Sequence, residues 1–305
     1  MKAGTNLEKI LESGRFAVTA EAGPPRGAVP SVIQRKGELL KPFCDALNVT
    51  DNQTAIVRMS SLSGCIILKQ LGTEPVMQMV CRDRNRIAIQ SDILGAVALG
   101  IGNILCLSGD YPSFGDHPTA KSVFDLDSIQ LIQLVAQMRD EKKFLSGEKI
   151  SGEVPLFIGA AENPFADPFE YRALRLAKKA KAGADFIQTQ AIFDIGKFAK
   201  WMEMITDRGM DKEVHILAGV IPIKTVGMAR YMRDNVPGVN VPDEIVTRME
   251  NAKDAREEGQ KICLEIIEQI KDIPGVHGIH IMAVGWEDIV PTIVEKAGLL
   301  PRPLL

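Results

Sequence analysis

The sequence predicts an α/β protein folded as one closed (β/α)8 barrel, the TIM-barrel architecture. Two observations carry this prediction: short apolar runs recur roughly every 30 residues, and segments with helical spacing lie between them. Each apolar run ends in a polar residue or a glycine, as a strand does where it meets a loop. The predicted strands are Phe16–Ala20, Ala46–Val49, Val76–Val80, Ile104–Leu107, Leu156–Ala161, Phe186–Ile187, Val214–Ala218 and His280–Val284.

The predicted strands are apolar on both faces, as in Ile104–Leu107, which is typical of parallel strands covered by helices. A doubly wound open sheet is the alternative, and it needs a Gly-rich phosphate loop after its first strand. Here the first run is followed by E-A-G-P-P (21–25), whose prolines cannot donate a backbone N–H to phosphate. The chain contains no G-x-G-x-x-G motif, so the closed barrel is favoured.

Helix signals lie between the predicted strands, where the barrel needs them. Asp127 is typical of an N-cap, Pro168 of a first helical turn and Gly183 of a C-cap. The predicted helices are an N-terminal helix around Leu7–Leu11, then Val29–Leu40, Asn85–Leu99, Asp127–Arg139, Asp167–Ala182, Asp194–Arg208, Lys224–Arg233, Pro242–Asn251 and Ala252–Ile270. The last three lie between the seventh and eighth strands, so extra helices are expected there.

Length and composition suit one globular domain. A barrel takes about 250 residues, so the 305 residues are expected to form a single domain spanning 1–305. The net charge of −3 gives no sign of a nucleic acid or an anionic membrane as partner. The longest apolar stretch, Ile93–Leu107, contains Asn103 and is shorter than the roughly 20 residues of a membrane span.

The N-terminus and the cysteines indicate a cytoplasmic protein. The first residues lack the apolar core of a signal peptide. The five cysteines are widely spaced, without a C-x-x-C motif, so free thiols in a reducing compartment are expected. Of the four histidines, only His277 and His280 have even a weak ligand spacing, and a strand that points one ring inward explains that pair. No metal site is predicted.

Two carboxylates at predicted strand ends are the candidate catalytic groups. Glu21 ends the first strand, where partial burial of a carboxyl group favours its protonated form and suits it to general acid catalysis. A structural, salt-bridged glutamate is the alternative. Asp110 follows Ser108 and Gly109 after the fourth strand, and a glycine lets the backbone approach a ligand closely. The long loop after Asp110 is typical of a binding loop, although Asp110 could instead cap a turn.

Amides, a hydroxyl and a lysine at other strand ends complete the candidate site. Gln188 and Gln190 lie in one strand, and alternation points both the same way, where amides can pair with the donor–acceptor edge of a heterocycle. Thr50 begins the T-D-N sequence that closes the second strand, although helix capping would also explain these residues. Lys179 belongs to a lysine-rich helix that mostly faces water, but a lysine near the mouth could meet a phosphate.

Taken in order, these segments resemble the methylenetetrahydrofolate reductase family of flavin-dependent (β/α)8 enzymes. The resemblance runs from about residue 15 to about residue 300, and it favours the short, single-domain bacterial type because the chain ends at Leu305. Each motif is weak alone, whereas the ordered set is specific. The matching motifs are T-A-E-A-G-P-P (19–25), N-V-T (48–50), C-R-D-R-N-R (81–86), L-S-G-D (107–110), A-G-A-D-F-I-Q-T-Q (182–190) and G-V-I-P-I (219–223).

The resemblance implies an enzyme of one-carbon metabolism that reduces 5,10-methylenetetrahydrofolate to 5-methyltetrahydrofolate, with hydride from N5 of a flavin. Glu21 would be the general acid that helps to open the imidazolidine ring. Asp110 would lie near both flavin and folate, and Gln190 would contact the pterin. FAD is the expected cofactor. The positions implied to contact it are Thr50, Gln78, Ser108, Gly109, Asp110, Asp167 and Lys179.

Two departures from the family pattern bear on the cofactor and the electron donor. Many relatives have histidine at the position of Gln78 and arginine at that of Ser108, and the lost positive charge leaves FMN as an alternative to FAD. Relatives often carry L-N-R where this chain has V-G-W (284–286). Electrons could therefore come from NAD(P)H or from a partner iron–sulfur protein, and both a homo-oligomer and a hetero-oligomer stay open.

Two other functions fit the same residues. A folate-binding methyltransferase barrel also presents Asp, Asn and Gln side chains to a pterin, but it needs no flavin. A flavoprotein electron-transfer subunit would carry flavin without folate.

Overall fold

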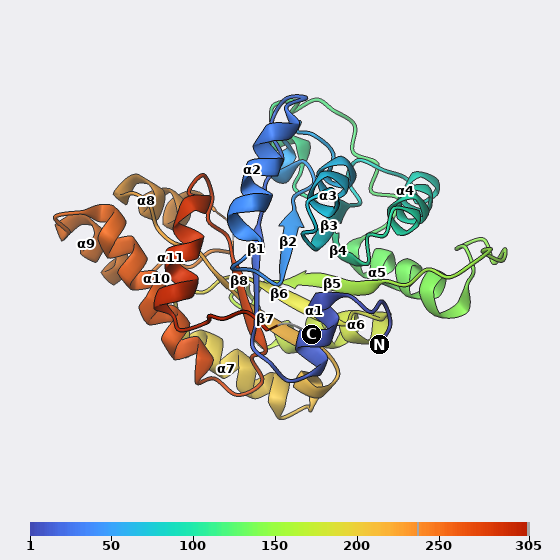
Figure 1. Ribbon diagram of the computed structural model, residues 1–305. Helices are drawn as coiled ribbons and strands as arrows, with labels where there is room; N and C mark the ends of the chain where they lie inside the picture. Colours follow the sequence, from blue (N-terminus) through green and yellow to red (C-terminus); the bar gives the residue numbers. More distant parts are fainter. Residues whose placement is uncertain (237, 304–305) are drawn as a thin grey trace.

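Eight parallel strands close into a barrel in the computed structural model of this protein, which describes residues 1–236 and 238–303. Each strand pairs with the next one along the chain, and β1 pairs with β8 to complete the closure (Figure 1). The predicted (β/α)8 fold is confirmed, and each predicted strand overlaps an observed one, although the eighth, predicted over His280–Val284, lies at Gly278–Ile281. The strands are β1 Ala17–Glu21, β2 Ala46–Val49, β3 Pro75–Val80, β4 Asn103–Leu107, β5 Phe157–Glu162, β6 Phe186–Ala191, β7 His215–Val220 and β8 Gly278–Ile281.

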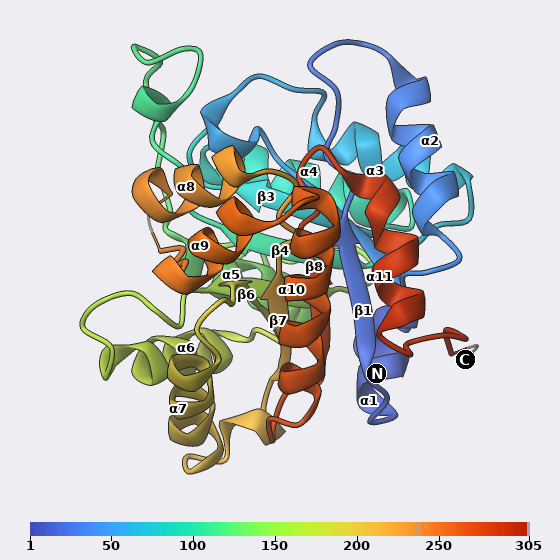
Figure 2. The ribbon, with the colours of Figure 1, turned by 90° about the vertical axis from the view of Figure 1, so that its left-hand side faces the viewer.

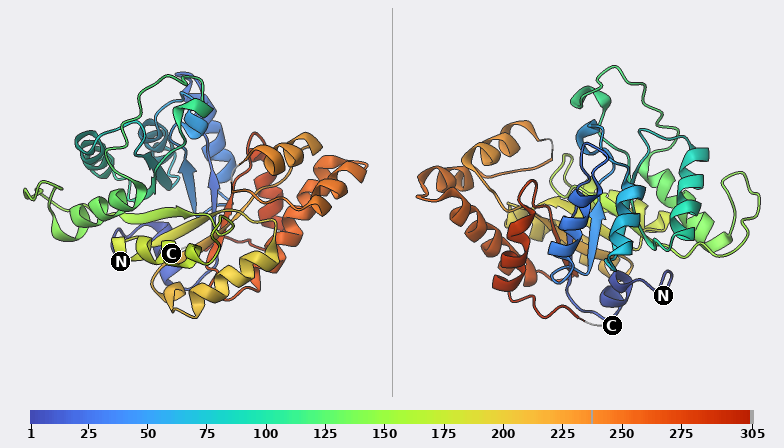
Figure 3. Two further views of the ribbon diagram at one scale, coloured as in Figure 1. Left: turned by 180° about the vertical axis from the view of Figure 1, so that it is seen from behind. Right: turned by 45° about the horizontal axis from the view of Figure 1, so that its top comes forward.

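Helices surround the strands (Figure 3). As predicted, α1 precedes the first strand, and α8, α9 and α10 form an insertion between β7 and β8 that projects to one side of the barrel (Figure 1). The α-helices are α1 Asn6–Glu12, α2 Pro30–Leu40, α3 Ser61–Gln70, α4 Arg86–Ala98, α5 Ser128–Ala136, α6 Tyr171–Ala182, α7 Ile195–Thr206, α8 Val226–Asn235, α9 Asp243–Asn251, α10 Ala255–Lys271 and α11 Val290–Lys296.

Local signals in the sequence set several helix ends. Asp127 and Gln130 form a capping box at the start of α5, with each side chain accepting the other residue's backbone N–H. Gly183 ends α6 with a φ of 112°. The predicted start of α6 is wrong, because turns occupy residues 167–170, and the carbonyl of Pro168 accepts the N–H of Tyr171, the first helical residue.

The barrel interior has an apolar lower layer and a polar middle layer. Helix α1 closes the amino end of the barrel with Leu7, Ile10 and Leu11, and its contacts there include the stacked rings of Phe157 and Phe186, whose centroids lie 5.2 Å apart. Barrel interiors are mostly filled by branched apolar side chains, so the polar layer above is unusual and indicates where the site begins. Its buried members are Thr19, Asn48, Gln78, Gln188 and His280.

Both ends of the described chain lie at the amino end of the barrel, opposite the mouth (Figure 2). Near the C-terminus, Arg302 donates to the carboxylate of Asp45 at 3.0 Å and to the carbonyl of Phe16 at 2.9 Å. Near the N-terminus, Lys2 pairs with the buried carboxylate of Asp185. These contacts fix both ends of the described chain against the amino ends of barrel strands.

The two neighbouring histidines have different surroundings, as the strand explanation predicts. The Nδ1 atom of His277 accepts the N–H of Ile216 at the amino end, whereas His280 is buried inside the barrel. In the described part of the chain, no helix has the length and hydropathy that a bilayer crossing requires. The predicted free thiols are confirmed, since all five cysteines are unpaired and buried.

Gly159 of β5 tests how tightly the lower barrel is packed. A Cβ atom there would lie 2.2 Å from Cζ of Phe186, so we expect Gly159→Ala to lower the free energy of unfolding by about 1–3 kcal/mol. Gly95 in α4 is the control, because a Cβ atom there meets nothing within 4 Å. Gly95→Ala should be neutral or stabilising by up to about 1 kcal/mol. Urea unfolding measures both variants, and equal stabilities would contradict this description of the packing.

Candidate functional site

A cavity of about 440 Å³ opens at the carboxyl end of the barrel. The cavity is lined by strand ends that share one mouth, as expected for this fold. They belong to β1, β3, β4, β5, β6 and β8, and residues of α6 and of the loop after β2 complete the lining. Candidate residues widely separated in sequence therefore meet there. The predicted site residues in the lining are Glu21, Gln78, Ser108, Gly109, Asp110, Lys179, Gln188 and Gln190.

Two predicted flavin contacts lie outside the cavity lining. Thr50 is buried directly after β2, its hydroxyl has no partner in the described chain, and residues 51–53 line the cavity in its place. Asp167 is exposed in the turns that precede α6. The resemblance matched these positions by order along the chain, which does not determine how the loops turn.

Glu21 lies at the edge of the cavity, above the polar layer. Its side chain is 15% exposed, and its Oε1 atom lies 3.9 Å from Nε2 of His280 on the neighbouring strand. The other ring nitrogen of His280 is 2.9 Å from the hydroxyl of Thr19. The basic neighbour of Glu21 is thus a histidine rather than a lysine or arginine, which favours the acid role over a structural salt bridge.

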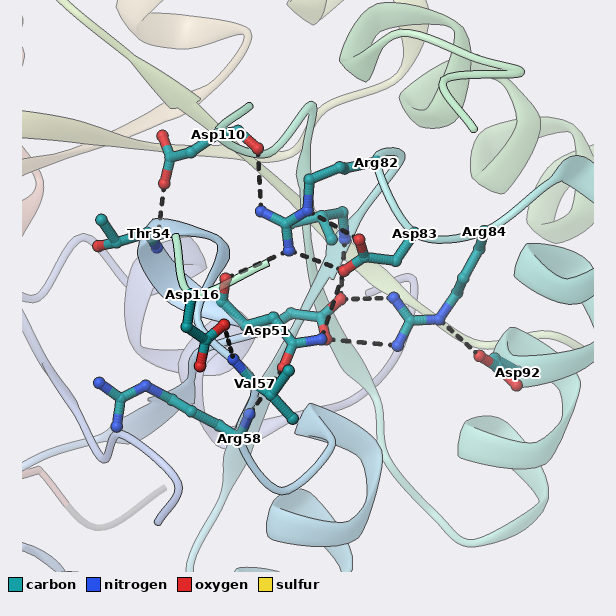
Figure 4. A network of polar contacts seen from close by, with 12 residues as sticks. Asp51, Thr54, Val57, Arg58, Arg82, Asp83, Arg84, Asp92, Asp110 and Asp116 are labelled. Carbon is teal, nitrogen blue, oxygen red and sulfur yellow. Dashed lines mark hydrogen bonds and ion pairs between the residues drawn. The ribbon is translucent and has the colours of Figure 1, made fainter. Parts of the chain in front are cut away.

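Arg82 joins three loops at the mouth (Figure 4). Its guanidinium donates to the carbonyl of Asp110 at 3.0 Å, to the carbonyl of Asn52 at 3.2 Å and to both carboxylate oxygens of Asp83 at 2.7 Å. The side chain is only 3% exposed, and the hydrogen bonds that it donates to Asp83 raise the pKa of Arg82. Arg82 therefore stays charged and holds the loops after β2, β3 and β4 together.

Asp51 supports the same loops from a buried position (Figure 4). Its carboxylate accepts the N–H of Val80 at 3.0 Å and a guanidinium N–H of Arg84 at 2.6 Å. Arg84 also pairs with Asp92 of α4 at 2.9 Å. The aspartate of the T-D-N sequence therefore holds the loops at the mouth together and does not cap a helix.

The Asp110 carboxylate lies against a strained turn, η1 (Gln53–Ala55). It accepts the N–H of Thr54 at 3.1 Å (Figure 4). Asn52, Thr54 and Ala55 have φ values of 46°, 59° and 55°, and such left-handed backbone costs about 1–3 kcal/mol per non-glycine residue and clusters at functional sites. Asp110 therefore caps a turn and also lines the cavity, so both predicted roles of this residue are compatible.

The two residues before Asp110 have structural reasons for their identity. Gly109 has a φ of 91°, and a Cβ atom there would lie 3.0 Å from Cβ of Val80. The hydroxyl of Ser108 accepts the N–H of Ser128 in the first turn of α5 at 3.3 Å. Gly109 lets the loop after β4 lie close to β3, and Ser108 ties the same loop to the start of α5.

Helix α6 gives the cavity a basic wall made of Arg172, Arg175 and Lys179. Lys179 is buried, and its ammonium donates to Glu162 at 2.6 Å. Burial lowers the pKa of Lys179, whereas the nearby Glu162 acts in the opposite direction. The two arginines are more exposed than Lys179 and add positive charge to this side of the mouth.

Sequence reasoning did not select Glu162, Arg82, Arg172 or Arg175 as site residues. Glu162 could have been found, because it follows an apolar run just as Glu21 does. Arg82 lies in the C-R-D-R-N-R motif (81–86), but its role depends on contacts between loops, and the roles of Arg172 and Arg175 depend on one face of a helix.

Fold and cavity together define a (β/α)8-barrel protein with a ligand site of acids, amides and bases at the carboxyl ends of its strands. A family model described as methylenetetrahydrofolate reductase matches residues 6–298. The chain belongs to the methylenetetrahydrofolate reductase family.

Individual relatives agree with this assignment. Methylenetetrahydrofolate reductase 2 of Schizosaccharomyces pombe is 26% identical, in a match that covers 99% of this chain and 48% of that protein. The chain thus spans about half the length of this relative. The 5,10-methylenetetrahydrofolate reductase of Pectobacterium carotovorum subsp. carotovorum is 23% identical, and the match covers 94% of this chain and 92% of that protein.

A solved structure shares the fold. It is described as an uncharacterized protein from Clostridium thermocellum that binds two copies of 5-methyl-5,6,7,8-tetrahydrofolic acid. The TM-score is 0.68 at 12% identity, and the match covers 96% of this chain and all of that one.

The buried pair of Lys179 and Glu162 predicts a measurable coupling. Lys179→Met leaves Glu162 buried without its partner and should lower the free energy of unfolding by about 3–5 kcal/mol. The double variant Lys179→Met/Glu162→Gln should recover much of that loss, because neither charge remains. Urea unfolding of the wild type, both single variants and the double variant gives the coupling energy. A coupling below about 0.5 kcal/mol would show that the pair is not an ion pair in solution.

Proposed function

We propose that this chain reduces 5,10-methylenetetrahydrofolate to 5-methyltetrahydrofolate in a flavin-dependent reaction. The observation that carries the proposal is that Glu21, Asp110 and Gln190 line one cavity in a member of this family. The shared barrel of the Clostridium thermocellum protein, described as binding a methylated tetrahydrofolate, supports a folate as ligand.

The three residues have distinct roles in this proposal. Glu21 donates its proton to the bridging nitrogen of the imidazolidine ring, which opens to an exocyclic iminium on the folate. The carboxylate of Asp110 stabilises the positive charge of that iminium electrostatically. The amide of Gln190 binds the donor–acceptor edge of the pterin.

The residues around the cavity fit a flavin as the resident cofactor. Gln78 contributes a buried amide to the lining, and Arg172 and Arg175 are suited to phosphate groups. A bound flavin would supply the hydride. The two arginines provide positive charge that Ser108 does not, and this charge suits the phosphates of FAD, the expected cofactor, as well as the phosphate of FMN, the alternative.

NAD(P)H and a partner iron–sulfur protein are the two electron donors in this proposal, and residues 284–286 favour the partner protein. Residues 284–286 offer no arginine to a nucleotide; Trp286 is buried, and the carbonyl of Gly285 accepts from Lys224 at 2.8 Å. We expect the isolated chain to oxidise NADH only slowly in steady-state assays while a chemically reduced sample still converts methylenetetrahydrofolate. Robust NADH oxidation would refute the partner-protein donor.

Glu21→Gln tests the proposed reaction against its alternatives. We expect the variant to lose methylenetetrahydrofolate reduction by about 100-fold or more and to keep the flavin, which is identified after release by denaturation. The exposed Glu38→Gln is the matched control and should stay active. Purified protein without visible flavin absorbance would favour the methyltransferase barrel. A flavin-bound wild type that does not reduce the folate would favour the electron-transfer subunit.

A further inference from the structure

A chain of side-chain contacts runs through the polar layer to Glu21. Asn48 donates to Oε1 of Gln188 at 2.6 Å, and Nε2 of Gln188 donates back to Asn48 at 3.1 Å and on to the hydroxyl of Thr19 at 3.3 Å. That hydroxyl lies 2.9 Å from Nδ1 of His280, whose Nε2 faces Oε1 of Glu21 at 3.9 Å. The four residues below Glu21 are each at most 3% exposed, so solvent reaches little of them, although Gln188 and His280 border the cavity.

The contacts of the Thr19 hydroxyl favour one position for the ring hydrogen of His280. Because the hydroxyl of Thr19 accepts from Gln188, its own hydrogen is free to be donated. Two acceptors are within reach: Nδ1 of His280 at 2.9 Å and the carbonyl of Ile279 at 3.4 Å. The shorter contact favours Nδ1, which must then be unprotonated. A neutral imidazole of this kind has its hydrogen on Nε2, the nitrogen that faces Glu21.

We propose that His280 is a positioning residue that selects which carboxyl oxygen of Glu21 carries the acidic proton. The proposal rests on the proposed function, in which Glu21 is the acid. Because Nε2–H can only donate, Oε1 of Glu21 must accept, and the proton resides on Oε2. Oε2 then delivers it to the folate nitrogen. The carboxylate that remains accepts the hydrogen bond from Nε2–H of His280, and His280 gives up no proton in this step.

The geometry of the strands places these groups together. The register of β1 against β8 sets Thr19 beside His280, and Glu21 lies two residues further along β1, on the same face. The 3.9 Å gap between Glu21 and His280 exceeds a direct hydrogen bond. Rotation of the partly buried Glu21 side chain closes it, since catalytic hydrogen bonds are often long before the substrate binds.

Two substitutions of His280 test this role, because each one retains a polar group near only one of the two ring nitrogens. His280→Asn keeps a polar group beside Thr19 but has no atom at the position of Nε2, whereas His280→Gln can place an amide N–H near that position. We expect kcat to fall about 100-fold in His280→Asn and less than about tenfold in His280→Gln. The KM for methylenetetrahydrofolate and the flavin content should not change. His277→Asn is the matched control and should stay active, because that ring lies outside the cavity lining.

The tautomer can be measured directly. The chain has four histidines, so 15N-histidine labelling gives a spectrum that the single variants assign. We expect an unprotonated Nδ1 and a protonated Nε2 in His280. Thr19→Val removes the hydroxyl and should raise the share of the Nδ1–H form, whereas Thr19→Ser should preserve the wild-type form. A protonated Nδ1 in the wild type would overturn the proposal.

The outcomes separate this proposal from the proposed function. Loss of activity in Glu21→Gln together with full activity in His280→Asn overturns the positioning role alone. Full activity in Glu21→Gln overturns the acid role and the positioning role together. Equal losses in His280→Asn and His280→Gln would indicate a purely structural histidine. If the position 280 variants do not fold, the ring spectrum and the two Thr19 variants decide.

Discussion

Closure of the barrel between its first and last strands is the constraint on which the whole site depends. That pairing brings Thr19 next to His280, although 261 positions separate them in the chain. Gly278 permits it, since a Cβ atom at this residue would lie 2.4 Å from the carbonyl oxygen of Ala17. A side chain at the start of β8 would therefore disturb the layer beneath Glu21 as well as the strand pairing.

At the mouth, above the pairing of β1 with β8, ion pairs and hydrogen bonds fix the orientation of the charged side chains. Arg82 pairs with Asp83 while holding two backbone carbonyls, and Lys179 pairs with Glu162. A site whose charges are already oriented needs little reorganisation when charge develops on a substrate. The strain at Asn52, Thr54 and Ala55 is tolerated because the surrounding loops are held in this way.

Strand positions and the main acids were predictable from sequence, because both leave a local pattern. An apolar run that ends in a polar residue marks a barrel strand, and the same rule placed Glu21, Asp110 and Gln190 at the mouth. Helices α3 and α11 were not predicted. The apolar residues of α3 do not follow one clear helical stripe, and α11, V-P-T-I-V-E-K, is rich in β-branched residues. The arginines of the site were missed because contacts between loops decide their roles, and adjacent sequence does not encode such contacts.

The position of the two chain ends has a practical consequence. Lys2 and Arg302 are both bound at the amino end of the barrel, away from the cavity. An affinity tag, a fluorophore or a surface tether joined to either end would leave the opening unobstructed. The protein could therefore be immobilised with the mouth of the barrel toward the solution, and the binding of large partners at that mouth could be followed at the surface.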